Sequence, residues 1–217
     1  MSAKDSKIVK TEPLDPSKAK WTRLISTTYT DPTGKTRTWE HAERPTRPKG
    51  SDIDAVGIVA VLEMDSGMSV SFRSQIYCRR PELLLQKQFR PPIANVCIEV
   101  PAGLVDASES AEQAAVRELK EETGYVGVVS ESSPVMFNDP GFCNTNLKMV
   151  HVTVDMANPE NKNPLPELEG GEFIECFTVP LKELYAECEK LEKEGYAIDA
   201  RVATLAGGIE IARQWKL

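Results

Sequence analysis

Residues 103–125 carry the sequence GLVDASESAEQAAVRELKEETGY, which decides the fold. Ser110 and Gln113 match a capping box at a helix start, and Gly124 suits the position just past a helix end. Between these signals, residues 111–123 contain no proline or glycine and many strong helix formers. The stretch therefore predicts one well-bounded helix.

That helix places acidic side chains together. Glu118 and Glu122 are four residues apart, so they stack on one side of the helix, and Glu121 lies close to the same side. Like charges at this spacing repel each other, whereas clustered carboxylate oxygens suit Mg²⁺ or Mn²⁺ together with phosphate oxygens. A solvated acidic face is the competing interpretation, and the neighbouring Arg117 and Lys120 are consistent with it.

The composition narrows the choice of partner. The chain has 217 residues, of which 41% are hydrophobic and 27% charged, as expected of a globular protein. A formal net charge of −7 argues against nucleic acid or an anionic membrane as the main partner. An acidic protein that acts on a polyanionic small molecule needs a positive group between them, and a divalent cation serves this purpose.

Several other classes are disfavoured. No apolar stretch approaches the roughly 20 residues that span a bilayer, and the N-terminus lacks the apolar core of a signal peptide. The 5 cysteines are scattered without a CxxC pair, which favours free thiols in a reducing compartment. We therefore expect the cytoplasm, with the nucleus as an alternative. Only 2 histidines are present, so acid–base chemistry falls to carboxylates.

The N-terminal third divides into three parts. Residues 1–20 are polar and are expected to form a flexible arm. Residues 21–30 and 35–44 have strand-forming composition around the turn sequence DPTG at 31–34, which predicts a β-hairpin. The run RPTRPKGSD is a linker by composition. We assign 1–20 to the arm, 21–52 to a hairpin that serves dimerisation, and 53–217 to the catalytic domain.

The rest of the chain alternates irregularly between strands and helices. Strands are expected at 55–64, over the material of 75–80 and 82–89, and at 95–101, 148–156 and 172–180. Helices are expected at 181–195 and about 200–215. Such an order is typical of an α/β protein with a mixed sheet flanked by helices.

The stretch from Gly103 to Tyr125 is similar to the Nudix box, G-x5-E-x7-R-E-U-x-E-E-x-G-U, where U is aliphatic or aromatic. All nine fixed positions match, namely Gly103, Glu109, Arg117, Glu118, Leu119, Glu121, Glu122, Gly124 and Tyr125. The resemblance implies an α/β/α sandwich, extended here by the N-terminal hairpin. It also implies hydrolysis of a nucleoside diphosphate derivative with Mg²⁺, or alternatively Mn²⁺.

The same resemblance implies roles for the motif residues. The carboxylates of Glu118 and Glu122 are expected to bind the metal with the carbonyl of Ala102 and with Glu99, and Glu121 is expected to act on the same face. Glu109 and Arg117 are expected to form a structural ion pair, and Gly103 and Gly124 to be structural. Bridging metals neutralise a pyrophosphate, stabilise its leaving oxygen and orient a water.

Beyond the box, the chain resembles the ADP-sugar pyrophosphatase branch of the Nudix hydrolases from about Trp21 to the final helix. The similar segments are TTYTDPTGKTRTWE (27–40), LLQKQFRPP (84–92), CIEVPAGL (97–104), DPG (139–141) and GEFIE (171–175). The branch implies ADP-ribose as substrate and Glu172 as the base that activates water. The residues implied to bind substrate are Trp21, Trp39, Glu40, Arg44, Arg90, Leu104 and Asp139.

The two tryptophans bear on assembly. If Pro32 and Thr33 form the hairpin loop, Trp39 lies opposite Ser26, and Trp21 is an odd number of residues from Ser26 and faces the other side. One hairpin then cannot clamp a base between its own tryptophans, but two hairpins from two subunits can. This agrees with the domain-swapped homodimer that the resemblance implies.

Simpler roles exist for several of these residues. A strand tryptophan usually packs, a loop glutamate such as Glu172 is usually solvated, and Asp139 suits the start of an Asp-Pro-Gly turn. Two other functions also stay open. One is hydrolysis of oxidised nucleoside diphosphates such as 8-oxo-dGDP, and the other is a non-catalytic nucleotide-binding module, although such modules typically lose box carboxylates that are present here.

Overall fold

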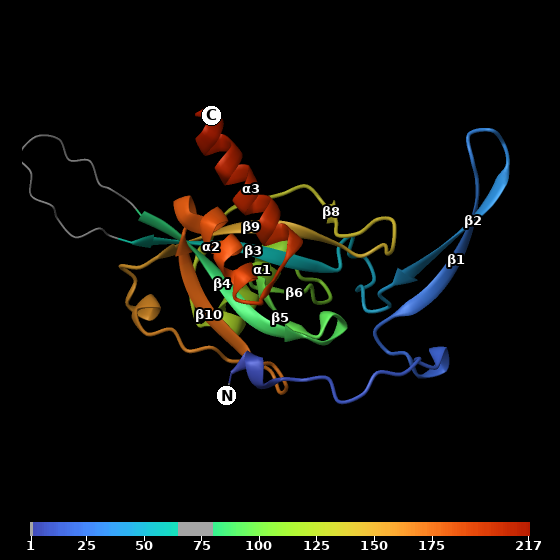
Figure 1. Ribbon diagram of the computed structural model, residues 1–217, viewed down its shortest axis with the longest axis horizontal. Helices are drawn as coiled ribbons and strands as arrows, with labels where there is room; N and C mark the ends of the chain where they lie inside the picture. Colours follow the sequence, from blue (N-terminus) through green and yellow to red (C-terminus); the bar gives the residue numbers. More distant parts are fainter. Residues whose placement is uncertain (1, 65–79) are drawn as a thin grey trace, which may run out of the picture.

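The protein is described by a computed structural model that covers residues 2–64 and 80–217 (Figure 1). Its centre is a nine-stranded mixed sheet in this part of the chain, with the order β11-β5-β4-β3-β9-β7. The strands on this path are β3 (Ala55–Met64), β4 (Arg80–Arg90), β5 (Asn95–Glu99), β7 (Val128–Ser132), β9 (Asn146–Asp155) and β11 (Ala197–Ile198). The remaining strands pair beside it: β6 (Ala102–Leu104) with β3, β8 (Met136–Phe137) with β9 and β10 (Ile174–Pro180) with β4.

Helices cover both faces of the sheet. On one face lies α1 (Ala111–Thr123), and on the other lie α2 (Leu184–Lys193) and α3 (Ala200–Trp215) (Figure 1). Each face has its own apolar core because successive side chains of a strand point to opposite sides. In β4, Leu84 packs into the core under α1, whereas Leu83 and Leu85 pack into the core under α2 and α3. The expected α/β/α sandwich is confirmed.

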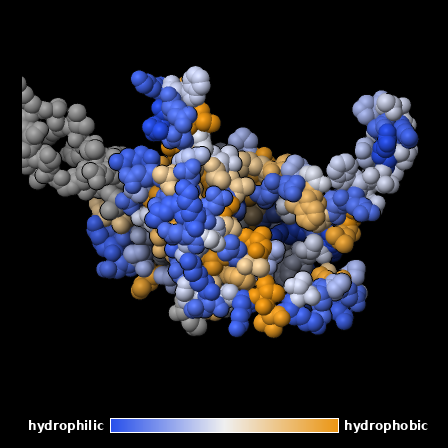
Figure 2. All heavy atoms as spheres, viewed as in Figure 1, coloured by the Kyte–Doolittle hydropathy of each residue, from blue (hydrophilic) through white to orange (hydrophobic). Residues whose placement is uncertain are grey.

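The N-terminal hairpin forms a separate two-stranded sheet of β1 (Arg23–Thr30) and β2 (Thr36–Glu43) that projects from the main body (Figure 1). Its outer end is largely hydrophilic (Figure 2). The base of the hairpin is fixed to the loop before β9, because the Ala42 amide donates to the Phe142 carbonyl over 2.8 Å.

The expected hairpin register is wrong by one residue. Trp39 lies opposite Thr27, and not opposite Ser26. The loop holds three residues between Asp31 and Lys35, since the Asp31 amide donates to the Lys35 carbonyl over 2.9 Å. Gly34, at φ +82, adopts the left-handed conformation that a three-residue hairpin loop needs at its last position.

This shift removes the parity argument about the tryptophans. Trp21 is six residues from Thr27, an even number, and it lies before the first residue of β1, Arg23. The register therefore does not place Trp21 and Trp39 on opposite faces of the hairpin.

Two further contacts attach the N-terminal arm and the loop after the hairpin to the main body. The start of the N-terminal arm differs from the expectation, because Ala3 is buried and its amide donates to Glu175 Oε1 over 2.6 Å. After the hairpin, the Arg47 guanidinium forms two parallel hydrogen bonds to buried Asp54, of 2.9 and 2.7 Å. This ion pair attaches the loop that follows the hairpin to the start of β3.

Two findings bear on the expectations about membrane-spanning segments and cysteines. None of the helices in residues 2–64 and 80–217 has the length and apolar character needed to cross a bilayer. Four cysteines are free thiols, namely Cys97, Cys143, Cys176 and Cys188. Cys78 and the strand expected over 75–79 lie outside the described residues.

Candidate active site

A cleft of about 810 Å³ lies where α1, β5 and β6 meet the loops that precede β10 and α3. It brings together most of the side chains expected from the sequence to act on substrate or metal. These are Arg44, Arg90, Glu99, Ala102, Gly103, Leu104, Arg117, Glu118, Glu121, Glu122 and Glu172. Segments separated by more than a hundred residues thus contribute to one concave site, which is the usual form of a small-molecule site.

The ends of α1 are fixed as the sequence predicts. The Ser110 side chain accepts from the Gln113 amide, and the Gln113 side chain accepts from the Ser110 amide, which is a complete capping box. At the other end Gly124 is left-handed, with φ +75, and a Cβ there would collide with the backbone of Leu165. The helix therefore presents its acidic residues from a fixed position.

Arg117 organises these residues. Its guanidinium makes two hydrogen bonds to Glu109, each of 2.9 Å, so the ion pair expected from the sequence is present. The same side chain also donates to Glu118 over 2.8 Å, to Glu121 over 3.0 Å and to the Leu104 carbonyl over 3.0 Å. The contacts with Glu118 and Glu121 were not anticipated, because sequence spacing alone does not show where a long arginine side chain ends.

Glu122 is the most buried acidic residue of α1, at 5% exposed. Burial raises the pKa of Glu122 to about 8, and the charges of Glu118 and Glu172 act in the same direction. The Ala102 amide opposes this rise by donating to Glu122 Oε2 over 2.9 Å. The pKa of Glu118 is also raised, by burial first and then by Glu121 and Glu172, although Arg117 opposes the rise.

These interactions show that Glu172 belongs to the acidic cluster. It comes from the loop before β10, and its charge acts on both Glu118 and Glu122 across the cleft. The loop is itself attached to the helix, since the Glu167 amide donates to the Glu121 carbonyl over 2.7 Å. The base expected from the resemblance is therefore tethered beside the expected metal ligands.

The acidic cluster fits a divalent cation that keeps part of its hydration. Within residues 2–64 and 80–217, no three His, Cys, Asp or Glu side chains are gathered tightly enough to form a ready-made chelate. Glu118 and Glu121 are instead paired with the guanidinium group of Arg117. Mg²⁺ typically binds proteins through one or two carboxylates and completes its shell with water and substrate phosphate, so this donor set suits it.

Gly103 provides independent support for that fit. A Cβ on this residue would lie well inside 3.0 Å of three atoms of the Glu118 carboxyl group. The missing side chain leaves room for the Glu118 carboxylate to lie against β6, beside the backbone of Ala102. The Glu118 carboxylate therefore occupies a position that only glycine at 103 permits.

Two ion pairs form another wall of the cleft. Arg90 donates to Glu99 over 2.8 and 2.5 Å, and Arg201 donates to Asp199 over 2.7 and 2.9 Å. Arg90 and Glu99 were expected to bind phosphate and metal, respectively, and here they bind each other. Asp199 and Arg201 were not anticipated, although Asp199 is the N-cap of α3 and such a cap is recognisable in a sequence.

Other cleft residues were also missed. Three come from strands, namely Ala55, Cys97 and Leu147, and the others come from outside strands and α-helices, namely Pro92, Ile93, Asp106, Asn138 and Glu169. Loop residues carry no periodic signal, so nothing in the sequence points to them individually.

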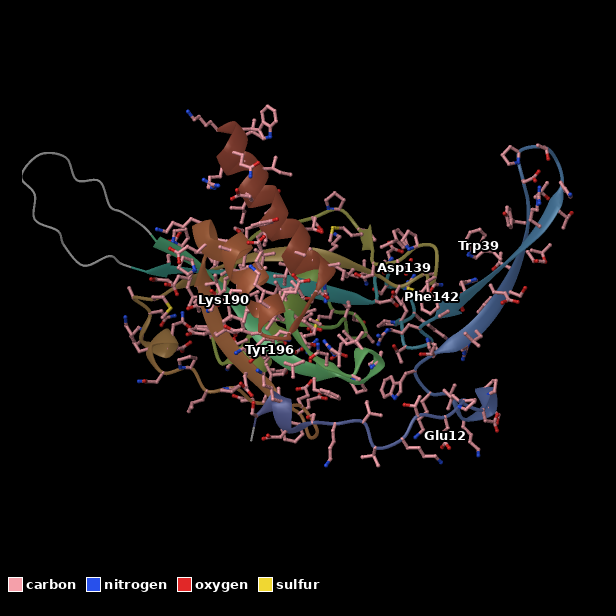
Figure 3. All side chains as sticks on the ribbon, in the orientation of Figure 1. Glu12, Trp39, Asp139, Phe142, Lys190 and Tyr196 are labelled. Carbon is pink, nitrogen blue, oxygen red and sulfur yellow. The ribbon has the colours of Figure 1, made fainter. Side chains whose placement is uncertain are left out.

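The residues expected to hold the base lie outside the cleft. The Trp39 indole donates to the Gly141 carbonyl over 3.0 Å and lines a smaller groove of about 310 Å³ with Phe137 and Pro140. Figure 3 shows Trp39 near Asp139 and Phe142, where the hairpin meets the body. The Asp139 carbonyl accepts from the Phe142 and Cys143 amides, which is the turn role considered for it.

Trp21 and Glu40 are on the hairpin side as well. Trp21 is 65% exposed, and Glu40 is exposed on β2 opposite Ser26. Neither lines the cleft within this chain.

Comparison with known proteins decides the family. Residues 73–202 match the NUDIX domain family. The chain is a Nudix hydrolase. It is 48% identical to an ADP-ribose pyrophosphatase of Saccharomyces cerevisiae, over 98% of this chain and 87% of that protein. It is 41% identical to an ADP-sugar pyrophosphatase of Mus musculus, over 86% of this chain and 80% of that protein.

A solved structure supports the fold independently. The crystal structure of an ADP compounds hydrolase superposes with a TM-score of 0.53, covering 97% of this chain and 90% of that chain at 18% identity. At this identity the match concerns the fold alone. Nudix hydrolases generally use a divalent metal ion, so the acidic cluster of α1 is where this hydrolase is expected to need one.

Proposed function

We propose that this Nudix hydrolase cleaves the pyrophosphate of ADP-ribose and related ADP-sugars with Mg²⁺, giving AMP and a sugar phosphate. The observation that carries the proposal is the convergence of Glu118, Glu121, Glu122 and Glu172 with Arg44 in one cleft of about 810 Å³. The names of the Saccharomyces cerevisiae and Mus musculus relatives support the substrate class.

The acidic cluster defines the reaction centre. Glu118 and Glu122, with the Ala102 carbonyl and Glu99, would hold Mg²⁺, which when bound supplies positive charge for the diphosphate. Glu99 accepts two hydrogen bonds from Arg90, so a metal bound to these oxygens would weaken the ion pair. Arg90 would then be more available for phosphate oxygens.

The water-activating step falls to the carboxylates of the cluster. Glu172 would accept a proton from the attacking water while the water oxygen forms a bond to phosphorus and the bridging P–O bond breaks. Glu121 would assist on the same face, where Arg117 orients it over 3.0 Å. The electron pair of the broken bond leaves with the departing phosphate oxygen.

The rest of the substrate would extend from this centre. Arg44 and Arg90 would hold phosphate or ribose oxygens, with Leu104 and Asp139 beside the substrate. Adenine would be held by aromatic stacking on the hairpin, from Trp39 and Trp21, with Glu40 nearby; Trp39 is 52% exposed and Trp21 is 65% exposed.

The exposed hairpin favours a homodimer. Within residues 2–64 and 80–217 its two strands join no other sheet apart from one bridge between Ala42 and Cys143, and Leu24 is 81% exposed. An isolated two-stranded sheet is marginally stable in water, so a second subunit that covers it would stabilise it. Residues 21–52 would then be the dimerisation element of a domain-swapped pair, and 53–217 the catalytic domain. The enzyme would act in the cytoplasm, or in the nucleus as the alternative.

A substrate panel tests the reaction. Purified full-length enzyme is incubated with ADP-ribose, ADP-glucose and 8-oxo-dGDP at equal concentration, with Mg²⁺, with Mn²⁺ or with EDTA. We expect AMP and ribose 5-phosphate from ADP-ribose at the highest kcat/KM, and no turnover with EDTA. A higher kcat/KM for 8-oxo-dGDP would assign the enzyme to oxidised nucleotides instead.

A pair of variants tests the acidic cluster. Glu122→Gln removes the buried charge with little change in shape and is expected to lower kcat by about 100-fold or more. Glu189→Gln on the exposed side of α2 is the matched control and should retain full activity. Near-normal turnover by Glu122→Gln would contradict the proposed metal site.

The homodimer has its own test. Light scattering after size exclusion is expected to give a mass near twice that of one 24.0 kDa chain. A charged residue at the exposed hairpin position, Leu24→Asp, should shift the protein towards monomer. A monomeric wild-type protein would refute the assembly without affecting the proposed reaction.

A further inference from the structure

The inference starts from Gln86 on β4, a polar residue in the core. Gln86 is 0% exposed and is adjoined along the strand by the buried residues Leu83, Leu84 and Leu85. Neither of its side-chain polar atoms, Nε2 and Oε1, has a hydrogen-bond partner within the described part of the chain. Leaving a buried amide unsatisfied destabilises the folded protein, so a leucine here would serve packing better.

The strand register shows what Gln86 faces. Leu84 points into the core under α1, and Gln86, two residues later, points the same way. Across the sheet Gln86 lies opposite Glu99 on β5 and Cys176 on β10. The unsatisfied amide is therefore aimed at the side of α1 that closes the cleft.

The residue of α1 at this place is Glu122. The Cys176 thiol donates to the Glu122 carbonyl over 3.7 Å, which places this turn of the helix above Gln86 and its strand neighbour. The Gln86 amide is close enough to favour the charged form of Glu122, which lowers the pKa against the effect of burial. Its alignment is nevertheless not that of a hydrogen bond.

Within the described part of the chain, one oxygen of Glu122 is held by a backbone amide. Oε2 accepts from the Ala102 amide over 2.9 Å. The second oxygen, Oε1, is the acceptor left for the Gln86 amide, which acts on this carboxyl group from β4. A carboxylate held by donors on both oxygens is fixed in orientation as well as in charge.

We propose that Gln86 is a positioning residue for Glu122, whose side-chain amide donates to Glu122 Oε1 when a divalent metal binds. The proposal deepens the proposed function, because it rests on the role of Glu122 at the metal. Residues that orient a metal ligand typically change metal affinity or activity by about 10–100-fold when they are replaced.

Metal binding to the substrate-free, full-length enzyme tests this without reference to turnover. Mn²⁺ is titrated and its free concentration followed by electron paramagnetic resonance, for wild type, Gln86→Leu and Gln86→Met. We expect both variants to bind Mn²⁺ about tenfold or more weakly, and their melting temperatures to be equal to or above wild type, since the buried amide has been removed. Gln86→Met keeps the length of the side chain if leucine disturbs the core.

Leu84→Met is the matched control. It changes packing on the same face of the same strand, so it should lower the melting temperature while leaving the Mn²⁺ affinity unchanged. An affinity loss below about fivefold in a folded Gln86→Leu or Gln86→Met protein would overturn the proposal. An equal affinity loss in Leu84→Met would also overturn it, because packing alone would then explain the effect.

Glu122→Gln separates this proposal from the function itself. If Glu122→Gln loses Mn²⁺ affinity and the Gln86 variants do not, only the role of Gln86 is overturned. If Glu122→Gln binds Mn²⁺ like wild type, the metal site of the proposed function fails and the positioning role fails with it.

Discussion

Replacing Gly103 with alanine tests whether the close approach of β6 to the acidic helix is required for catalysis. The added Cβ would lie well inside 3.0 Å of the Cδ, Oε1 and Oε2 atoms of Glu118. Gly103 is not among the described residues with positive φ, so alanine suits its backbone. The three atoms nearest to the added Cβ all belong to Glu118, so the clash with this side chain is the main obstacle to the substitution.

The size of the effect follows from this geometry. The Glu118 carboxylate must retreat by about 1 Å to reach the closest separation that real Cβ contacts show. The end of a glutamate side chain moves easily, so we expect unfolding to become easier by only about 1 kcal/mol, or roughly 2–4 °C in melting temperature. Displacing a catalytic group by about 1 Å costs roughly 100-fold in rate, so kcat should fall by about that factor.

The assay is steady-state hydrolysis of ADP-ribose at saturating Mg²⁺, combined with a thermal melt of the same preparation. Gly207→Ala in α3 is the control, because a Cβ there meets nothing within 4 Å. It should retain full activity and melt slightly higher, as alanine favours a helix over glycine. If Gly103→Ala keeps wild-type kcat, the close approach has no role in catalysis and our interpretation of the metal site is wrong.

Four further outcomes are expected. Arg117→Lys should lower the free energy of unfolding in urea by about 2 kcal/mol, because lysine cannot make two parallel bonds to Glu109; unchanged stability would show that the pair is not structural. Asp54→Asn should lower the free energy of unfolding at pH 7 by about 3 kcal/mol, with a lower melting temperature, since it leaves the Arg47 guanidinium without its carboxylate partner. Burial raises the pKa of Asp54, but the hydrogen bonds from Arg47 and a backbone amide outweigh it and lower that pKa. The stability from Asp54 is thus present above about pH 4 and is lost as the pH falls through the lowered folded value, so the two melting temperatures should converge in acid; a constant gap would contradict this. Mg²⁺ at about 100 times its dissociation constant should stabilise the folded protein by about 2.7 kcal/mol, and EDTA should reverse this; a melt insensitive to both would argue against a metal. Trp39→Ala should weaken ADP-ribose binding in calorimetry by about 1–3 kcal/mol, and unchanged affinity would leave Trp39 a packing residue.

The helix that carries the chemistry was predictable because its signals are local. Ser110 and Gln113 sit at one end of α1 and Gly124 at the other, and each acts on backbone groups within four residues of itself. The predicted bounds of 111–123 agree with the structure. Strand β3 was equally clear, since its apolar run at 55–62, largely buried on both faces, has few alternatives.

Short strands gave no comparable signal. Strand β7 is polar in three of its five residues, and its pairing with β9 shifts register between Val129 and Glu131. Strands β6, β8 and β11 have two or three residues each and exist only because a longer neighbour pairs with them. Their formation depends on tertiary contacts that no local pattern records.

The site was predictable where residues share an element and unpredictable where they meet across elements. The stacking of Glu118 on Glu122 follows from helix spacing, and the Glu109–Arg117 pair follows from the resemblance. The pairing of Arg90 with Glu99 depends instead on the register of β4 with β5. The hairpin register failed for a related reason, because the left-handed Gly34 lengthens the loop by one residue and moves Trp39 opposite Thr27.

The attachment of the Glu172 loop to α1 limits how this region can change in evolution. Leu165 lies against Gly124, and the Glu167 amide is bonded to the Glu121 carbonyl, so the loop is pinned five residues before Glu172. Fully extended, five residues span at most about 17 Å. Insertions before Leu165 should be accommodated as harmless surface variation, whereas even a single added residue after Glu167 would change where the carboxylate comes to rest.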